Sequence, residues 1–239
     1  MSEQGKRLDG RIVLVTGASR GIGAAVAKRF AQEGARLVLT ARTTGALEEI
    51  DDEIQKITGE PATLVPLDLT DYHAIDRLGA AIFERFGKLD VLIGNAGQLG
   101  ILSPLAHIDP KVWEAVMAVN VTANWRLIRS MDPLLRTSDA GRGIFVTSTV
   151  AREARAYWGA YAVSKAALEM TALIYAAEVE KTAVRVNLIN PGATRTAMRA
   201  QAFPGEDPET LKTPESITGL FVELAEAACS RNGECLQPD

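Results

Sequence analysis

The chain has 239 residues, of which 47% are apolar and 23% are charged, and its net charge is −4 at pH 7. This length and composition are those of one large α/β domain, and they exclude disorder along the whole chain. The small negative charge excludes the electrostatic signature of a nucleic-acid-binding protein, and no apolar run is long enough to span a membrane.

The cysteines and histidines give no pattern of metal ligands. Cys229 and Cys235 form no Cys-x-x-Cys pair, and the two histidines lie far from them in the sequence, so no metal site is expected. Two thiols without partners indicate a reducing compartment. Residues 1–11 are polar and do not resemble a signal peptide. We therefore expect a cytoplasmic protein.

Strand-like and helix-like stretches alternate along the sequence, which predicts right-handed βαβ units and a parallel sheet. Strands are expected at residues 12–15, 36–40, 62–67, 89–93, 144–147, 184–189 and 234–237. Helices are expected at residues 21–33, 47–57, from 70 or 71 to 86, 110–135, 157–180 and 214–228. The prediction is a single-domain α/β fold over residues 1–239, a doubly wound, Rossmann-type parallel sheet of about seven strands flanked by helices on both faces. The stretch 193–213 has no clear period and is expected to be a mobile substrate loop.

The glycine-rich loop after the first strand carries the clearest functional signal. Residues 12–15 form a continuous apolar run, typical of a strand that is buried on both faces. Gly17, Gly21 and Gly23 follow, and a helical pattern begins at Gly21. A loop between a buried strand and a helix N-terminus presents free N–H groups and a positive dipole end, which favour a bound phosphate. The spacing Gly-x-x-x-Gly-x-Gly differs from the commoner Gly-x-Gly-x-x-Gly, but its context predicts a site for the pyrophosphate of a dinucleotide.

The same loop also matches the Gly-x-Ser-x-Gly nucleophile elbow of hydrolases, with Ser19 as the candidate nucleophile. That interpretation needs a histidine base late in the chain, after an acidic residue. The two histidines, His73 and His107, both lie in the first half. The context therefore disfavours a hydrolase.

Glycines and polar residues follow the ends of several predicted strands. In an open parallel sheet, ligands bind outside the carboxyl ends of the strands. Besides the glycine loop, these ends carry Asp68, the run Asn95-Ala96-Gly97, Ser148 and the pair Pro191-Gly192. Turn formation alone explains any one of them. Five such features at corresponding strand ends predict a ligand site there.

Tyr161 and Lys165 lie four residues apart in a predicted helix, so their side chains share one face. Such pairs also occur by chance on solvent-exposed helices. A phenol has a pKa of about 10, too high for ready proton exchange at neutral pH, and an adjacent ammonium lowers that pKa. Ser148, thirteen residues before Tyr161, can hydrogen-bond a substrate oxygen. The three residues predict general acid–base catalysis of hydride transfer at a carbonyl carbon.

Together these motifs resemble the short-chain dehydrogenase/reductase family, from about Leu8 to Leu236. The resemblance rests on Thr16-Gly17-Ala18-Ser19-Arg20-Gly21-Ile22-Gly23, Asn95-Ala96-Gly97, Asn120, Ser148, Tyr161-x-x-x-Lys165 and Pro191-Gly192. It implies that Tyr161 is the catalytic acid or base, that Lys165 lowers its pKa and binds the nicotinamide ribose, and that Ser148 orients the carbonyl. It also implies that Asn120 holds a water linking Lys165 to solvent. Thr149 is a competing hydroxyl, but the spacing to Tyr161 favours Ser148.

The resemblance further implies a set of cofactor contacts along the strand ends. Asp68 contacts the adenine, Asn95 supports the cofactor cleft, and two threonines after Pro191-Gly192 lie near the carboxamide. The expected cofactor-binding residues are Gly17, Ser19, Arg20, Gly21, Ile22, Gly23, Arg42, Asp68, Leu69, Asn95, Ala96, Gly97, Tyr161, Lys165, Pro191, Gly192, Thr194 and Thr196.

The end of the second predicted strand indicates which dinucleotide binds. An acidic residue there would bond a ribose 2′-hydroxyl and repel a 2′-phosphate. The strand instead ends in Thr40-Ala41-Arg42, and Arg42 offers a planar set of donors suited to phosphate. Arg20, in the glycine loop, is a second cation nearby, and NADP-dependent members that this chain resembles carry basic residues at these two positions. Ordinary surface arginines are the alternative, and we predict a preference for NADP(H) over NAD(H).

The substrate is expected to be a small carbonyl or alcohol compound, with sugar, steroid-like, acyl and small aromatic carbonyls all left open. The expected pocket residues are Gln98, Leu99, Val150, Glu153, Tyr157, Trp158 and residues 193–213. Arg152 and Arg155 can pair either with an acidic substrate or with Glu153 and solvent.

A catalytically silent NADP(H)-binding sensor or scaffold is the alternative function, because a fold does not determine a function. The complete set of Asn120, Ser148, Tyr161 and Lys165 argues against it. Long exposed helices favour a homodimer or homotetramer. The stretch 233–239 departs from the Gly-x-x-Leu-x-Val-Asp-Gly-Gly-like ending of many family members, which affects the tetramer contacts expected there rather than the catalytic centre.

Overall fold

The computed structural model describes residues 6–238, so residues 1–5 of the polar N-terminal segment and Asp239 lie outside the described residues. Seven parallel strands form one sheet in the order β3-β2-β1-β4-β5-β6-β7. The strands are β1 (Ile12–Thr16), β2 (Arg36–Ala41), β3 (Thr63–Pro66), β4 (Val91–Gly94), β5 (Arg142–Val146), β6 (Arg185–Ile189) and β7 (Cys235–Leu236). The strand order reverses between β1 and β4, where this kind of sheet binds its ligands. The predicted doubly wound sheet is confirmed.

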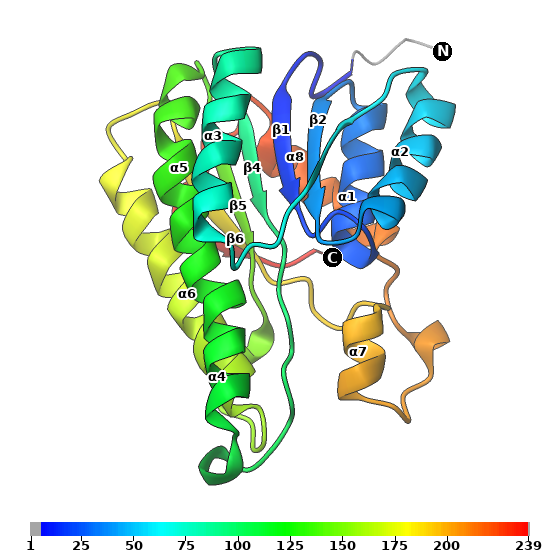
Figure 1. The fold of residues 1–239 in the computed structure, drawn as a ribbon, viewed down its shortest axis with the longest axis vertical. Helices are drawn as coiled ribbons and strands as arrows, with labels where there is room; N and C mark the ends of the chain where they lie inside the picture. The colour runs from blue at the N-terminus through cyan, green and yellow to red at the C-terminus, as the bar shows by residue number, and fades with distance from the viewer. Residues whose placement is uncertain (1–5, 239) are drawn as a thin grey trace.

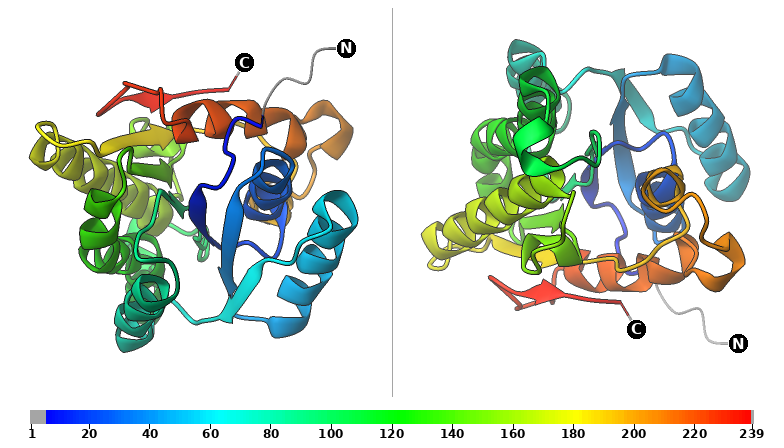
Figure 2. Two further views of the ribbon diagram at one scale, coloured as in Figure 1. Left: turned by 90° about the horizontal axis from the view of Figure 1, so that it is seen from above. Right: turned by 90° about the horizontal axis from the view of Figure 1, so that it is seen from below.

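Helices cover both faces of the sheet, as Figures 1 and 2 show. The helices of one face are α1 (Gly21–Gln32), α2 (Thr44–Thr58) and α8 (Thr218–Ala225). Those of the other face are α3 (Tyr72–Phe86), α5 (Ala123–Thr137) and α6 (Gly159–Glu178). Each face buries its own apolar cluster against the strands, and both clusters are formed mainly by aliphatic side chains. Two further helices, α4 (Pro110–Met117) and α7 (Ala197–Ala202), extend beyond the carboxyl ends of the strands (Figure 1).

Local sequence signals explain several helix boundaries. The side chain of Asp71 accepts a hydrogen bond from the Ala74 amide at the start of α3, as expected of an N-cap residue. Gly59 and Gly87 follow α2 and α3 with φ angles of +79° and +73°, a left-handed conformation that glycine adopts without strain. The structure contains no helix, within residues 6–238, that is both long and apolar enough to cross a membrane.

The helix predicted at 110–135 is divided by a π-helical turn at Ala118–Thr122, which lies between α4 and α5. Asn120 lies in this turn, and its side chain exchanges two hydrogen bonds with the backbone of Gln98. The backbone carbonyl oxygen of Asn120 accepts a third hydrogen bond, from Nδ2 of Asn124. These bonds favour the widened turn, and π-helical turns occur frequently at functional sites. Apolar periodicity alone cannot show them.

The predicted start of β5 and the predicted end of α8 both differ from the structure, and one buried arginine contacts both places. Arg142 begins β5 two residues before the predicted start. Its guanidinium donates to the carbonyl oxygens of Glu226, Ala227 and Cys229 at 3.1, 2.7 and 2.9 Å. These carbonyls lie just beyond α8, which ends at Ala225 instead of continuing to 228. Burial lowers the pKa of Arg142 to about 10.

The stretch 193–213 is more regular than predicted. It contains α7 and a short 3-10 helix, Pro208–Thr210. Thr196 caps α7 by accepting a hydrogen bond from the Arg199 amide at 3.1 Å. The mobility of this segment stays a prediction.

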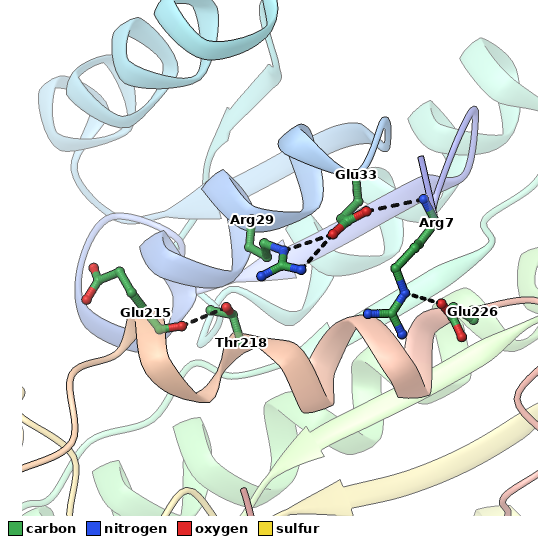
Figure 3. Close-up of polar contacts among 6 residues, drawn as sticks. All are labelled: Arg7, Arg29, Glu33, Glu215, Thr218 and Glu226. Atoms are coloured by element: carbon green, nitrogen blue, oxygen red, sulfur yellow. Dashed lines mark hydrogen bonds and ion pairs between the residues drawn. The ribbon is translucent and has the colours of Figure 1, made fainter. Parts of the chain in front are cut away.

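The segment before β1 is held against α1 and α8 by the polar contacts in Figure 3. Arg29 donates two hydrogen bonds to Glu33, whose carboxylate also accepts one from the Arg7 amide at 3.2 Å, and the Arg7 side chain pairs with Glu226. Pairs this close to solvent contribute about 0–1 kcal/mol each. Leu8, which is fully buried beside them, contributes about 1.5–3 kcal/mol and is the stronger anchor.

Candidate active site

A cleft of about 1080 Å³ opens at the carboxyl ends of the strands, where the strand order reverses between β1 and β4. It brings together nearly all the predicted site residues. Its wall includes Gly17, Ser19, Arg20, Gly21, Ile22, Arg42, Asp68, Leu69, Asn95, Ala96, Gly97, Ser148, Tyr161, Lys165, Pro191, Gly192, Thr194 and Thr196. Gly23 and Asn120 do not line the cleft and instead support its wall from behind.

The glycine loop leaves no room for side chains at two of its glycines. A Cβ at Gly17 would lie 3.0 Å from the Cα of Ala96, and one at Gly23 would lie 2.2 Å from the Gly17 carbonyl oxygen. Gly17 and Gly21 have φ angles of +65° and +57°. Arg20, at the start of α1, makes no capping hydrogen bond with its side chain. The first amides of the helix therefore remain available to a phosphate group, and the loop fits the pyrophosphate of a dinucleotide.

The loop is held to the end of β4 by Thr16 and Asn95. The buried hydroxyl of Thr16 accepts hydrogen bonds from the amides of Asn95 and Ala96 at 3.0 and 3.1 Å, and donates to the Ile93 carbonyl at 3.0 Å. Nδ2 of Asn95 donates to the carbonyl oxygens of Thr16 and Gly17 at 2.9 and 3.2 Å. This role of Thr16 was not predicted from the sequence. The signal that could have indicated it is the position of Thr16 directly before the glycine loop.

Ser148, Tyr161 and Lys165 meet on the cleft wall, where β5 and α6 lie together. Ser148 lies close enough to Tyr161 to oppose the rise in the pKa of the phenol. Nζ of Lys165 donates to the Val146 carbonyl at 2.8 Å and lies 5.7 Å from the centroid of the Tyr161 ring. The competing hydroxyl of Thr149 points elsewhere, because it accepts a hydrogen bond from Asn190. The orientation of Thr149 favours Ser148 as the partner of Tyr161, and this assignment stays a prediction.

Burial sets the proton affinities of this pair. It raises the pKa of Tyr161 to about 12, although the hydrogen bond with Ser148 opposes the rise. It lowers the pKa of Lys165 to about 8. Desolvation is therefore the largest influence on both pKa values, and the lowering of the Tyr161 pKa by Lys165 stays a prediction.

Asn120 lies behind the cleft wall and bonds to residues next to Tyr161 and Lys165. Its Nδ2 donates to the Gln98 carbonyl at 3.0 Å and to Oγ of Ser164 at 2.9 Å, and its Oδ1 accepts from the Gln98 amide at 2.9 Å. Ser164 lies between Tyr161 and Lys165 on α6. Asn120 thus fixes the chain after β4 to the helix that carries Tyr161 and Lys165, and its role in holding a water stays a prediction.

Two exposed arginines lie at the other end of the cleft. Arg20 and Arg42 make no side-chain hydrogen bond or ion pair to any residue within 6–238. Asp68, at the end of β3, accepts two hydrogen bonds from Thr70. The backbone hydrogen bond from Thr70 lowers the pKa of Asp68, and the charge of Arg42 adds to this effect. The site therefore presents two guanidinium groups that are free to bind an anion.

Comparison with known proteins identifies the family. The family model described as short chain dehydrogenase matches residues 11–207. The chain belongs to the short-chain dehydrogenase family of oxidoreductases. It is 44% identical to the uncharacterized oxidoreductase YciK of Escherichia coli (strain K12) over 219 residues, which cover 91% of this chain and 86% of that protein.

Other relatives of this short-chain dehydrogenase differ in the cofactor that their names give. A crystal structure of a short chain dehydrogenase from Escherichia coli CFT073 complexed with NADPH matches with a TM-score of 0.95 at 41% identity, covering 98% of each chain. An uncharacterized NAD-dependent oxidoreductase of Mycobacterium tuberculosis (H37Rv) is 32% identical over an aligned length of 257, covering 94% of this chain and 92% of the relative. Cofactor choice in this short-chain dehydrogenase must therefore be argued from its own residues.

The substrate half of the dehydrogenase cleft differs from the predicted pocket. Gln98, Leu99 and Trp158 line it, whereas Val150, Glu153 and Tyr157 do not. From the stretch 193–213 the wall contains Thr194, Thr196, Ala197, Met198, Arg199, Gln201 and Ala202. The sequence-based prediction missed the contribution of Val112 and Ala115 on α4 and of Val119 in the π-helical turn that follows it. Their helical spacing was a signal, but it fits a buried core face equally well.

The two arginines considered as substrate ligands have partners within the protein. Arg152 pairs with Glu169 rather than Glu153, with Nε donating to Oε2 at 2.7 Å. The Arg155 guanidinium lies 5.4 Å from the centroid of the Trp158 ring and 4.8 Å from that of Phe203. Neither arginine lines the cleft.

Proposed function

We propose that this short-chain dehydrogenase transfers a hydride between NADP(H) and a carbonyl or alcohol substrate, with Tyr161 as general acid or base. The observation that carries the proposal is that Ser148, Tyr161 and Lys165 line the same cleft as the glycine loop. A phosphate-binding loop and an acid–base group on one continuous wall are what hydride transfer with a dinucleotide requires.

The residues present fit NADP(H). The crowded glycines and the uncapped start of α1 would hold the pyrophosphate. Arg20 and Arg42, both unpaired among the described residues, would bind a 2′-phosphate. The remaining contacts would come from Asp68, Leu69, Asn95, Ala96, Gly97, Pro191, Gly192, Thr194 and Thr196. When bound, the nicotinamide supplies or accepts the hydride.

The chain's own residues manage the oxygen and its proton. Ser148 donates a hydrogen bond to the carbonyl oxygen and orients it. In reduction, Tyr161 donates its Oη proton to that oxygen as the carbonyl carbon receives the hydride. In oxidation it accepts the hydroxyl proton as the hydride leaves the carbon. The positive charge of Lys165 stabilises the phenolate in both directions.

The test measures oxidation of NADPH, and separately of NADH, over a panel of aldehydes and ketones. We expect turnover that prefers NADPH and that falls by about 10²- to 10⁴-fold in Tyr161→Phe, because the phenol supplies the proton. Tyr72→Phe, a change of the same size at the start of α3 and outside the cleft, is the matched control. Undiminished turnover in Tyr161→Phe would contradict the role of Tyr161, and NADPH binding without turnover on any substrate would favour a sensor or scaffold.

We also propose that the enzyme assembles as a homodimer or homotetramer through α5 and α6. Trp125 on α5 and Met170 and Ile174 on α6 are large apolar side chains exposed to solvent. Covering such a surface with a second copy removes apolar area from water. Sedimentation equilibrium tests this proposal, and a monomer at micromolar concentration would contradict it.

A further inference from the structure

We propose that the substrate of this site is an uncharged, largely apolar carbonyl compound held between α4 and α7. The inference rests on the proposed function and adds the class of substrate to it. It comes from the part of the cleft that lies beyond Ser148 and Tyr161.

One side of this region is an apolar face of α4. Val112 and Ala115 lie three residues apart on α4, so they share the side of the helix that lines the cleft, and Val119 in the following π-helical turn extends this side. Leu99 and Ile101, from the chain after β4, continue the same wall. Ile101 is 63% exposed, which is unusual for a large aliphatic side chain beside a cleft. These residues offer a ligand apolar area and no hydrogen-bonding side chain.

The opposite side is formed by α7 and Trp158. Met198 and Ala202 of α7 line the cleft. Phe203, directly after α7, packs against Trp158 with ring centroids 5.6 Å apart. Nε2 of Gln201 donates to the Gly100 carbonyl at 3.4 Å, which links α7 to the wall that α4 continues. The two sides thus enclose a space with largely apolar walls.

Charged side chains in this half of the cleft already have partners. The charged residues in the whole wall are Arg20, Arg42, Asp68, Lys165 and Arg199, and the first three lie at the adenine end. Arg199 bonds both carboxylate oxygens of Glu206 at 2.5 Å, and its guanidinium stacks on Phe203 at 3.8 Å from the ring centroid.

Lys165 lies beneath the tyrosine ring and donates to Val146. A carboxylate or an ammonium on the substrate would therefore lose water without gaining an ionic partner, which is costly. Two amide side chains, Gln98 and Gln201, can still contact a neutral polar substituent.

The test compares pairs of ketones of similar size that carry either a neutral or a charged substituent. The first pair is methyl 4-acetylbenzoate and 4-acetylbenzoate. The second pair is 4-tert-butylacetophenone and its isosteric 4-trimethylammonio analogue. We expect kcat/KM with NADPH to be at least about tenfold higher for the neutral member of each pair, because only that member enters the cleft without losing ionic hydration. Equal or higher kcat/KM for a charged member overturns the inference.

A designed cation provides the second arm of the test. Ala115→Lys places an ammonium on the exposed α4 face of the cleft, so the preference for methyl 4-acetylbenzoate over 4-acetylbenzoate should fall by at least about tenfold. Glu114→Gln makes the same change in net charge at the neighbouring residue, which does not line the cleft, and should leave the preference unchanged. An unaltered preference in a folded Ala115→Lys variant overturns the placement of the substrate between α4 and α7.

Failure of the inference and failure of the proposed function give different results. If no ketone is reduced, the proposed function fails, and the same pairs are then titrated as ligands by NMR in the presence of NADPH. Tighter binding of the neutral members, with the preference for methyl 4-acetylbenzoate over 4-acetylbenzoate reduced in Ala115→Lys, supports the inference. Equal binding, or no binding of any member, overturns it.

Discussion

The two halves of the cleft are built in different ways. In the cofactor half, the wall is backbone at the ends of the strands, with Gly17 held against Ala96 and hydrogen bonds from Thr16 and Asn95 joining β1 to β4. In the substrate half, the wall consists mainly of side chains from α4, α7 and the chain after β4. One 3.4 Å hydrogen bond and the packing of Phe203 on Trp158 hold α7 to the rest of the molecule, whereas α4 packs against α6 and continues into the π-helical turn.

This difference makes the cofactor half less tolerant of sequence change than the substrate half. Amides and carbonyls at strand ends can be positioned only by the sheet, so the cofactor half has little tolerance for change. Side chains on helices beyond the sheet can be exchanged without disturbing the strands. The same scaffold can therefore keep one cofactor site while its substrate site varies.

The largest expected effect on NADPH binding comes from one methyl group added to the glycine loop. In Gly23→Ala the new Cβ would lie 2.2 Å from the Gly17 carbonyl oxygen and 2.6 Å from Nδ2 of Asn95. The backbone must shift, at a cost of about 1–3 kcal/mol, and we expect NADPH binding to weaken by up to about 100-fold in a fluorescence titration. Gly45→Ala, in α2 with nothing within 4 Å of the new Cβ, is the control and should bind NADPH normally. Normal NADPH binding by Gly23→Ala would show that the loop is not rigid.

Removing Arg42, a proposed ligand of the 2′-phosphate, should change the choice between NADPH and NADH without affecting the substrate half. We expect Arg42→Ala to raise the KM for NADPH by about tenfold and to leave the KM for NADH unchanged, because only NADPH carries the 2′-phosphate. Arg36→Ala, at the opposite end of the same strand, is the matched control. If both KM values rise together in Arg42→Ala, Arg42 does not distinguish the two cofactors.

Loosening α7 should affect the substrate half alone. Phe203→Ala removes the packing against Trp158, and aromatic pairs of this kind contribute about 0.5–1.5 kcal/mol. We expect the KM for the ketone to rise by about two- to tenfold while the dissociation constant of NADPH stays the same. Phe83→Ala on α3, where the ring is 62% exposed, should change neither value. A parallel loss of NADPH affinity in Phe203→Ala would mean that the two halves are coupled.

The smallest expected effect is the dependence of kcat/KM on pH, which amounts to about twofold at the midpoint of the titration of Lys165. The pKa of Lys165 is lowered by burial to about 8, so its positive charge is present below pH 8 and is lost as the pH rises above it. Because that charge stabilises the phenolate, kcat/KM for reduction should fall above pH 8. Tyr161, with a pKa of about 12, should not titrate between pH 6 and 9. A profile that falls below pH 7 instead would contradict this assignment.

Much of the cofactor half could be predicted from the sequence, because its signals are local. Gly17, Gly21 and Gly23 lie within seven residues that join a strand to a helix, and Tyr161 and Lys165 lie one turn apart. The order of apolar stretches predicted the strands that place Ser148 and Asn95 at the same edge of the sheet. Such features depend on the chain's own neighbourhood and on rules of sheet topology.

The rest depends on contacts between residues that are distant in the sequence. Thr16 bonds to Asn95 across 79 positions, and Arg142 bonds to the end of α8 across 84 to 87 positions. Asn120 in the π-helical turn bonds to Gln98 across 22 positions. The apolar face of α4 has the same spacing as a core face, so only the fold shows that it lines the cleft. Residue patterns cannot supply these long-range pairings.

The most direct test of the account is a single-turnover reaction with NADPH carrying deuterium on C4 of the nicotinamide and the ketone that the enzyme reduces best. The account predicts deuterium on the carbinol carbon of the product with the unmodified enzyme. It also predicts transfer slowed by about 10²- to 10⁴-fold in Tyr161→Phe, with the dissociation constant of NADPH unchanged. Undiminished transfer in Tyr161→Phe, or bound NADPH that transfers no deuterium, would contradict it.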